Sequence, residues 1–111
     1  MAALHEFKAE LYKMLGHPTR LRILELLRTG EKTVSEIQQT LDIEASSASQ
    51  QLAIMRSRQL VDTRKMGTKV FYTVRDPLIF ELMDIARQIF ENQVVSMNSL
   101  LDDNRGSFID G

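Results

Sequence analysis

The chain has 111 residues, of which 43% are hydrophobic and 26% are charged, and its formal net charge is −1. This length and composition predict one globular domain, not a disordered segment. The absence of cysteine excludes disulfides, thiolate metal sites and thiol redox sensing. No apolar run approaches the length of a membrane span, and the N-terminus lacks a secretory pattern, so we expect a cytoplasmic protein without membrane contact.

The charges are distributed unevenly along the chain. Residues 1–55 hold six basic and seven acidic side chains, residues 56–75 hold six and one, and residues 76–111 hold two and seven. The three segments therefore carry net charges of −1, +5 and −5, which sum to −1. A basic segment between acidic ends can bind phosphate locally despite the nearly neutral total. An ordinary solvated hairpin is the alternative interpretation of this segment.

Helical spacing of apolar residues predicts two helices in the N-terminal part of the chain. The first covers residues 3–15 and ends at Gly16. Its apolar face consists of Leu4, Phe7, Leu11 and Met14. Pro18 suits the first turn of the second helix, because an amide hydrogen would have no helical partner there. This helix is rich in leucine and stops at Gly30, so we expect it at the centre of the core.

Two shorter helices follow, joined by a tight connection at residues 42–45. Thr33 is a good N-cap for the first, and Glu36 three residues later completes a capping box. The second opens at Ser46 and has two distinct faces. The face expected to pack on the core consists of Ala48, Leu52 and Met55. The face expected to point outward consists of Ser46, Ser49, Gln50 and Ala53.

Residues 60–74 predict a two-stranded β-hairpin. Its first strand begins at Leu60 and Val61, and Gly67 suits the turn. The second strand alternates through Val70, Tyr72 and Val74. Cations near the tip of this hairpin suit contact with the phosphates of a duplex.

Asp76 can cap the last predicted helix, with Pro77 at its first position. Its apolar residues, which extend to Leu101, are too many for one stripe, so the helix needs cover on two sides. We expect a second subunit on one side, and an isologous homodimer is the economical solution. Burial wholly within one chain is the alternative. The expected interface residues are Leu4, Phe7, Leu11, Leu82, Ile85, Ile89 and Phe90. The domain then spans residues 1–101, and residues 102–111 form a polar tail.

Three segments in combination resemble the ArsR family of bacterial winged-helix repressors. They are the sequence GHPTRLRILELL at residues 16–27, the serine-rich run at residues 46–52, and the basic hairpin ending in Phe71 and Tyr72. The likeness covers about residues 5 to 100. It implies a mainly α fold with a small β-hairpin, arranged as a dimeric winged helix-turn-helix of four helices, two strands and a final helix. It also implies a homodimeric repressor, and an autorepressor in particular, on a palindromic operator in double-stranded DNA.

The recognition helix of this family opens with Ser-Gln-Ser-x-x-Ser-His. Ser46 and Ser49 match this pattern, whereas Glu44, Ala45 and Gln50 replace the first Ser, the Gln and the His. The matching serines keep a phosphate or base-edge role, and a glutamine can pair with adenine N6 and N7 in the major groove. Because the replacements change the hydrogen-bonding groups, the operator should differ from those of relatives.

The expected DNA contacts come from this helix and from the basic hairpin, or wing. They are Ser46, Ser47, Ser49, Gln50, Arg56, Arg64, Lys65 and Lys69. For Arg56 a surface salt bridge is the alternative. A winged helix used for protein–protein contact is the alternative function, although such domains usually lack clustered wing cations. The serines have no histidine nearby and there is no phosphate-binding glycine loop, so we expect no catalysis.

Many relatives sense metals, and the corresponding positions can be compared here. Thr33 and Ser35 stand where one family site has cysteines, and they are poor ligands for soft metals. At a second family site only Asp76 matches. The remaining positions of that site hold Leu78, Ile89 and Asn92. His17 belongs to the scaffold motif, and His5 with carboxylates across a dimer is a minor alternative. We therefore expect neither metal nor cofactor, and an unknown small molecule, a protein partner or no effector stay open as modes of regulation.

Overall fold

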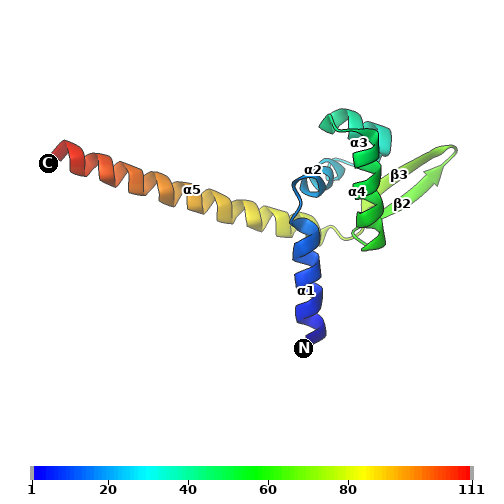
Figure 1. Ribbon diagram of the computed structural model, residues 1–111, viewed down its shortest axis with the longest axis horizontal. Helices are drawn as coiled ribbons and strands as arrows, with labels where there is room; N and C mark the ends of the chain where they lie inside the picture. The colour runs from blue at the N-terminus through cyan, green and yellow to red at the C-terminus, as the bar shows by residue number, and fades with distance from the viewer. Residues whose placement is uncertain (1, 111) are drawn as a thin grey trace. The chain divides into compact units, whose positions relative to one another are not determined.

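The computed structural model describes the backbone of residues 2–110 and the side chains of residues 2–101. The chain divides into two compact units, Met1–Pro77 and Leu78–Gly111. The elements of the first unit are α1 (Ala2–Leu15), α2 (Pro18–Leu27), β1 (Lys32–Thr33), α3 (Val34–Leu41), α4 (Ala45–Ser57), β2 (Val61–Met66) and β3 (Lys69–Val74) (Figure 1). The second unit consists of α5 (Leu78–Asp110). Across the described residues, no helix has the length and apolar character needed to span a membrane.

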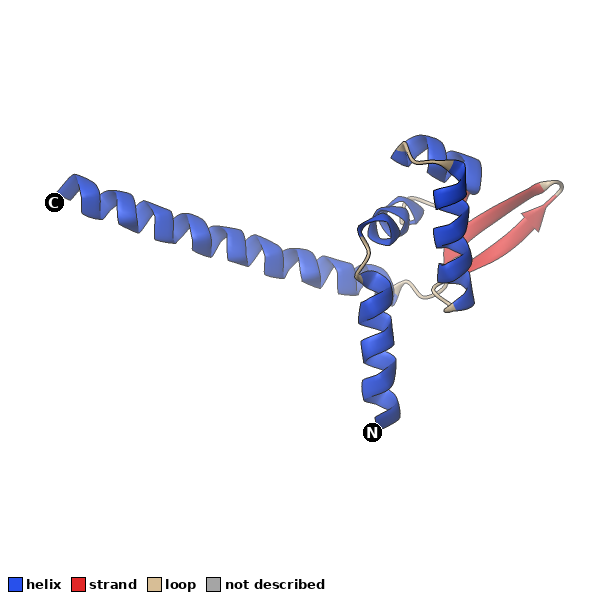
Figure 2. Ribbon diagram, viewed as in Figure 1, coloured by secondary structure: helices blue, strands red, loops and turns tan. Residues whose placement is uncertain are grey.

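The predicted order of helices and strands is confirmed with one addition, the short strand β1. The sequence predicted a two-stranded hairpin, which Figure 2 shows as β2 and β3. The sheet has a third antiparallel strand, and its order is β1-β3-β2. Lys32 pairs with Tyr72 and Thr33 pairs with Phe71. A strand of two residues shows no alternation in the sequence. It forms because β3 offers a free edge whose backbone groups need partners.

The core of the first unit lies between α2, α3, α4 and the start of β2. Its largest fully buried side chains are Ile23, Leu24, Ile37, Leu52, Met55 and Val61. The prediction that α2 is central is confirmed for its inward stripe only, since Leu21 is 37% exposed. A helix that packs on one side buries the residues of one face, so leucines outside that face stay in contact with water.

Local signals fix the ends of α3. The amide of Thr33 donates to Oε1 of Glu36 over 3.1 Å, and the amide of Glu36 donates to Oγ1 of Thr33 over 3.2 Å. The predicted capping box is therefore confirmed. At its other end α3 stops at Asp42, whose φ of 53° places it in the left-handed region. Asp tolerates this conformation better than most residues, because its short side chain can hydrogen-bond locally.

Replacing Thr33 by alanine should lower the free energy of unfolding by about 1 kcal/mol, because the amide of Glu36 loses its acceptor. Chemical denaturation followed by circular dichroism measures this loss. Thr33→Ser keeps the hydroxyl and is the matched control, so it should retain most of the stability. Equal losses in both variants would show that the threonine methyl matters and the cap does not.

The predicted polar tail at residues 102–111 lies outside the described side chains. The backbone of α5 continues to Asp110, so no helix end marks the predicted boundary after Leu101. The contacts within one chain divide residues 1–77 from α5. They do not test whether residues 1–101 act as one domain, so that domain stays a prediction.

Candidate nucleic-acid interface

Helices α3 and α4 are joined by only three residues, 42–44. The amide of Asp42 bonds to the carbonyl of Gln38, and that of Ile43 bonds to the same carbonyl over 3.2 Å. Glu44 is the N-cap of α4, but its side chain makes no capping hydrogen bond. Helix α4 therefore begins at Ala45, one residue before the predicted start at Ser46. Its first backbone amides lack a side-chain cap, and the N-terminus of such a helix favours anionic groups.

The rotation of α4 is fixed by its buried face. Ala48, Leu52 and Met55 are all 0% exposed, as their spacing predicted. The predicted outward residues are all exposed, and they are Ser46, Ser49, Gln50 and Ala53. Ser47, also predicted to contact DNA, is half-buried. The buried stripe thus holds a row of small hydrogen-bonding side chains toward solvent.

Arg20 connects α2 to α4 through a contact that the sequence did not indicate. Its Nε donates to Oε1 of Gln51 over 2.9 Å, and its Nη1 donates to the carbonyl of Met14 over 3.4 Å. Arg22 donates to the carbonyl of Leu41 over 2.8 Å. The arginines at residues 20 and 22 therefore join α2 to α1, α3 and α4. Their occurrence in a leucine-rich helix was the only signal available in the sequence.

His17 has the structural role that the sequence predicted for it. It is the N-cap residue of α2, and its Nδ1 accepts a hydrogen bond from the amide of Thr19 over 3.2 Å. Pro18 occupies the first turn, as expected. The HPTR sequence at residues 17–20 thus starts α2 and, through Arg20, links it to α4.

A Schellman motif ends α4 and directs the chain into β2. The amide of Leu60 bonds to the carbonyl of Met55 over 2.9 Å, and that of Gln59 bonds to the carbonyl of Arg56 over 3.0 Å. Gln59 has a φ of 63°, the left-handed conformation that this motif requires. The motif fixes the geometry between α4 and the hairpin that follows it.

The two arginines at the end of α4 differ in their surroundings. Arg58 pairs with Glu10 of α1 over 3.6 Å, and both side chains are more than half exposed. Such a surface pair contributes little to stability. The sequence offered a surface salt bridge as the alternative role of Arg56, but the pair with Glu10 is made by Arg58. Arg56 itself is exposed.

The hairpin of β2 and β3 carries two lysines near its turn. Gly67 has a φ of 63°, and it is the only turn residue with positive φ, as in a type II′ turn. Lys65 pairs with Val70 and Lys69 pairs with Met66. Because successive residues of a strand point to opposite faces, the two ammonium groups lie on opposite faces of the hairpin. Both lysines are exposed.

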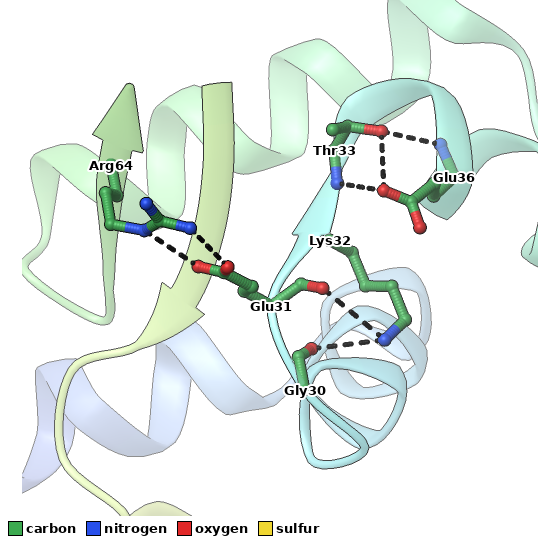
Figure 3. Close-up of polar contacts among 6 residues, drawn as sticks. All are labelled: Gly30, Glu31, Lys32, Thr33, Glu36 and Arg64. Atoms are coloured by element: carbon green, nitrogen blue, oxygen red, sulfur yellow. Dashed lines mark hydrogen bonds and ion pairs between the residues drawn. The ribbon is translucent and has the colours of Figure 1, made fainter. Parts of the chain in front are cut away.

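Arg64, the third predicted wing contact, is engaged within the chain. Its Nε donates to Oε2 of Glu31 over 3.1 Å, and its Nη2 donates to Oε1 of the same carboxylate (Figure 3). Its guanidinium carbon also lies 5.3 Å from the ring centre of Phe71. The hydrogen bonds from Arg64 lower the pKa of the Glu31 carboxyl, and the carboxylate raises the pKa of the arginine.

An open groove lies between the start of α3 and the tip of the wing. It is lined by Thr33, Val34, Ser35, Glu36, Thr68, Lys69 and Val70. Hydrogen bonds from the backbone and hydroxyl of Thr33 lower the pKa of Glu36, and the charge of Lys69 adds to this effect. Thr33 is therefore committed to its cap. Among the described residues no three His, Cys, Asp or Glu side chains gather as a metal site requires. The expected absence of a metal stays a prediction.

The residues predicted at a dimer interface fall into two groups. The exposed ones are Leu4, Phe7, Ile85, Ile89 and Phe90. The half-buried ones are Leu11 and Leu82. Further exposed apolar side chains on α5 are Val94, Val95, Met97, Leu100 and Leu101. Large apolar side chains exposed in such number along one helix indicate an interaction surface.

Comparison with known proteins identifies the family. Residues 17–63 match the family model described as bacterial regulatory protein, arsR family. The chain is 36% identical over 103 residues to the uncharacterized HTH-type transcriptional regulator Rv0081 of Mycobacterium tuberculosis, with 92% of this chain and 90% of that protein covered. The chain belongs to the arsR family of bacterial regulatory proteins. The resemblance seen in the sequence is therefore confirmed, and the matched residues run from the N-cap of α2 into β2.

Other relatives and solved structures agree with this assignment. A biofilm growth-associated repressor of Agrobacterium fabrum is 37% identical over 82 residues, which is 74% of this chain and 70% of that protein. The crystal structure of Rv0081 superposes with a TM-score of 0.76, covering 84% of this chain and 94% of that chain. The homodimeric winged helix-turn-helix DNA-binding domain of Mb0332 from Mycobacterium bovis gives 0.75 at 29% identity, with 84% and 86% covered. The winged helix-turn-helix fold predicted from the sequence is thus confirmed.

Proposed function

We propose that this arsR-family protein is a homodimeric transcriptional repressor that binds a palindromic operator. The observation that carries the proposal is the outward face of α4. Three fully buried residues on the opposite side lock this helix, so its exposed serines and glutamine face solvent, and a basic hairpin follows the helix in the chain. Family membership and relatives named as repressors support the same function and weigh against a module that only binds proteins.

In the proposed complex α4 enters a major groove, whose width admits an α-helix. Gln50 is the proposed base reader, because its amide can both accept from N6 and donate to N7 of adenine. Ser46 and Ser49 bind phosphate or base edges. Arg56 lies in the last turn of α4, and its proposed contact is the DNA backbone beside the groove. Lys65 and Lys69 bind phosphates from the wing.

We propose that the exposed apolar side chains of α5 form the dimer interface, with α1 contributing. The homodimeric state of the Mycobacterium bovis domain supports this assembly. A two-fold dimer presents two copies of α4, so its operator should contain two half-sites about one helical turn apart, or roughly 34 Å. The protein would act in the cytoplasm as a regulator without catalytic activity. The effector stays open among a small molecule, a protein partner and none.

Binding to DNA from upstream of the chain's own gene tests the proposal. Fluorescence anisotropy with this duplex should give a dissociation constant on the order of 10⁻⁸ M or tighter at modest salt. A shuffled duplex of equal length is the control, and it should bind at least 1,000-fold more weakly, on the order expected for non-specific binding. Footprinting then locates the half-sites. Equal affinity for both duplexes at physiological salt would overturn the proposal.

Replacing both Lys65 and Lys69 by alanine should weaken binding to every duplex by a similar factor. Each phosphate contact contributes about 0.9 to the magnitude of the slope of log K against log salt. Losing two contacts should therefore reduce this magnitude by about 1.8 for each subunit. Titrations at several salt concentrations measure this change. Loss of affinity for the operator alone, with shuffled DNA unaffected, would show that the wing reads bases instead of phosphates.

A further inference from the structure

We propose that Arg64 is a positioning residue of the wing and does not bind phosphate. Its side chain, together with Glu31 and Phe71, forms a clamp that ties the hairpin to the start of the helix-turn-helix. The proposal rests on the proposed function, because the hairpin is the part of the chain assigned to the DNA backbone. It changes which cations of the basic segment meet DNA, leaving that role in the hairpin to Lys65 and Lys69.

The clamp connects all three strands of the sheet. Arg64 lies on β2 directly opposite Phe71 of β3, and Phe71 is paired on its other side with Thr33 of β1. Glu31 immediately precedes β1. The arginine therefore reaches from one edge strand, over the ring of the central strand, to the carboxylate beside the other edge. Figure 3 shows its two hydrogen bonds to Glu31.

The contacts of this arginine are of the stronger kind. Isolated surface ion pairs contribute little, but a guanidinium fork bonded through two nitrogens to one carboxylate is geometrically specific. The arginine side chain is 48% exposed and that of Glu31 is 36% exposed, so water reaches the pair only in part. Stacking on Phe71 adds a cation–π contact and covers a half-buried ring.

Binding a phosphate would compete with this arrangement. The Nε and Nη2 groups of Arg64 that donate to Glu31 are the same donors that would bind a phosphate. Transfer to DNA would leave the carboxylate of Glu31 unpaired near a polyanion and would uncover Phe71. The lysines have a smaller cost, because both are exposed near the turn and Lys69 acts on Glu36 through charge alone.

The position of Glu31 explains why the clamp matters for DNA. Two residues later Thr33 caps α3, and α3 leads through three residues into α4. A contact between Glu31 and Arg64 therefore fixes the base of the wing relative to the helices that enter the groove. Without it the hairpin keeps its own pairing but loses a fixed orientation, so its lysines still reach the phosphates but ordering the hairpin on DNA costs free energy.

Four variants of the full chain test the clamp on the operator duplex: Arg64→Ala, Glu31→Gln, Arg64→Lys, and the exchange Glu31→Arg with Arg64→Glu. Each single variant should weaken binding by about five- to tenfold, the effect of a lost charge-assisted contact. The salt slope should stay at the wild-type value. The exchange variant should recover most of the affinity, because it restores the ion pair with its charges reversed. Arg75→Ala is the matched control, since it removes the same charge from a looser pair with Asp62 at 3.9 Å, and it should have little effect.

A phosphate-binding Arg64 gives the opposite results. Arg64→Ala would then lower the slope by about 0.9 per subunit. Glu31→Gln would strengthen binding by freeing the guanidinium, and the exchange variant would bind worst because it presents a glutamate to DNA. Any of these results overturns the clamp while leaving the repressor in place. Wild-type protein that shows no preference for the operator would instead overturn the proposed function.

Discussion

Replacing Ile89 by lysine is expected to convert the dimer to a monomer and to abolish operator binding at working concentrations. Ile89 is 53% exposed in the single chain, so a lysine there should not disturb the fold of one subunit. In the proposed dimer the same position is buried, and burying an unpaired charge costs several kcal/mol. A monomer makes only half of the DNA contacts, so the apparent affinity should fall by about 100-fold or more.

Sedimentation velocity measures the assembly, and anisotropy with the operator measures binding. Gln88→Lys is the matched control, because it adds the same charge at the neighbouring position. Gln88 lies between Arg87 and Glu91, whose ion pair marks the polar face of α5. The control should remain dimeric and bind DNA. An intact Ile89→Lys dimer would contradict the assignment of the interface, whatever the effect on DNA.

The elements with local signals could be predicted from the sequence. Thr33 and Glu36 lie three residues apart and specify the start of α3 by themselves. Ala48, Leu52 and Met55 follow the helical period, so their burial, and the exposure of the opposite face, needed no knowledge of the rest of the chain. Gly67 fixed the turn of the hairpin for a similar reason, since a glycine adopts positive φ readily.

The features missed by the sequence depend on partners far along the chain. β1 exists only through β3, about forty residues later. Arg64 finds Glu31 at a separation of 33 residues, and Arg20 finds Gln51 at a separation of 31. A charged residue shows no preference for one distant partner over another in sequence. A count of cations could therefore identify the basic segment, but not which of its members the fold already uses.

Gln50→Ala should cost about 1–3 kcal/mol of operator binding and relax base preference at one position in each half-site. Gln50 is exposed on the outward face of α4, four residues after Ser46 and two before the buried Leu52. Its amide is the group on this face best suited to pairing with adenine, since the serines offer one hydroxyl each. Alanine is a better helix former than glutamine, so α4 should remain intact.

Selection from a randomised operator library, followed by sequencing, compares the wild type with this variant. The loss of preference should be confined to one base pair per half-site, because a bidentate contact spans a single base edge. Gln88→Ala, which removes an exposed glutamine from the polar face of α5, should leave the selected sequence unchanged. The serines contribute differently, since a hydroxyl bonded to phosphate fixes register without reading sequence. If Gln50→Ala weakens binding uniformly and the selected operator stays the same, Gln50 holds the backbone. The base-reading role would then pass to other residues at the start of α4, beginning with Glu44 and Ala45, where this chain departs from its relatives.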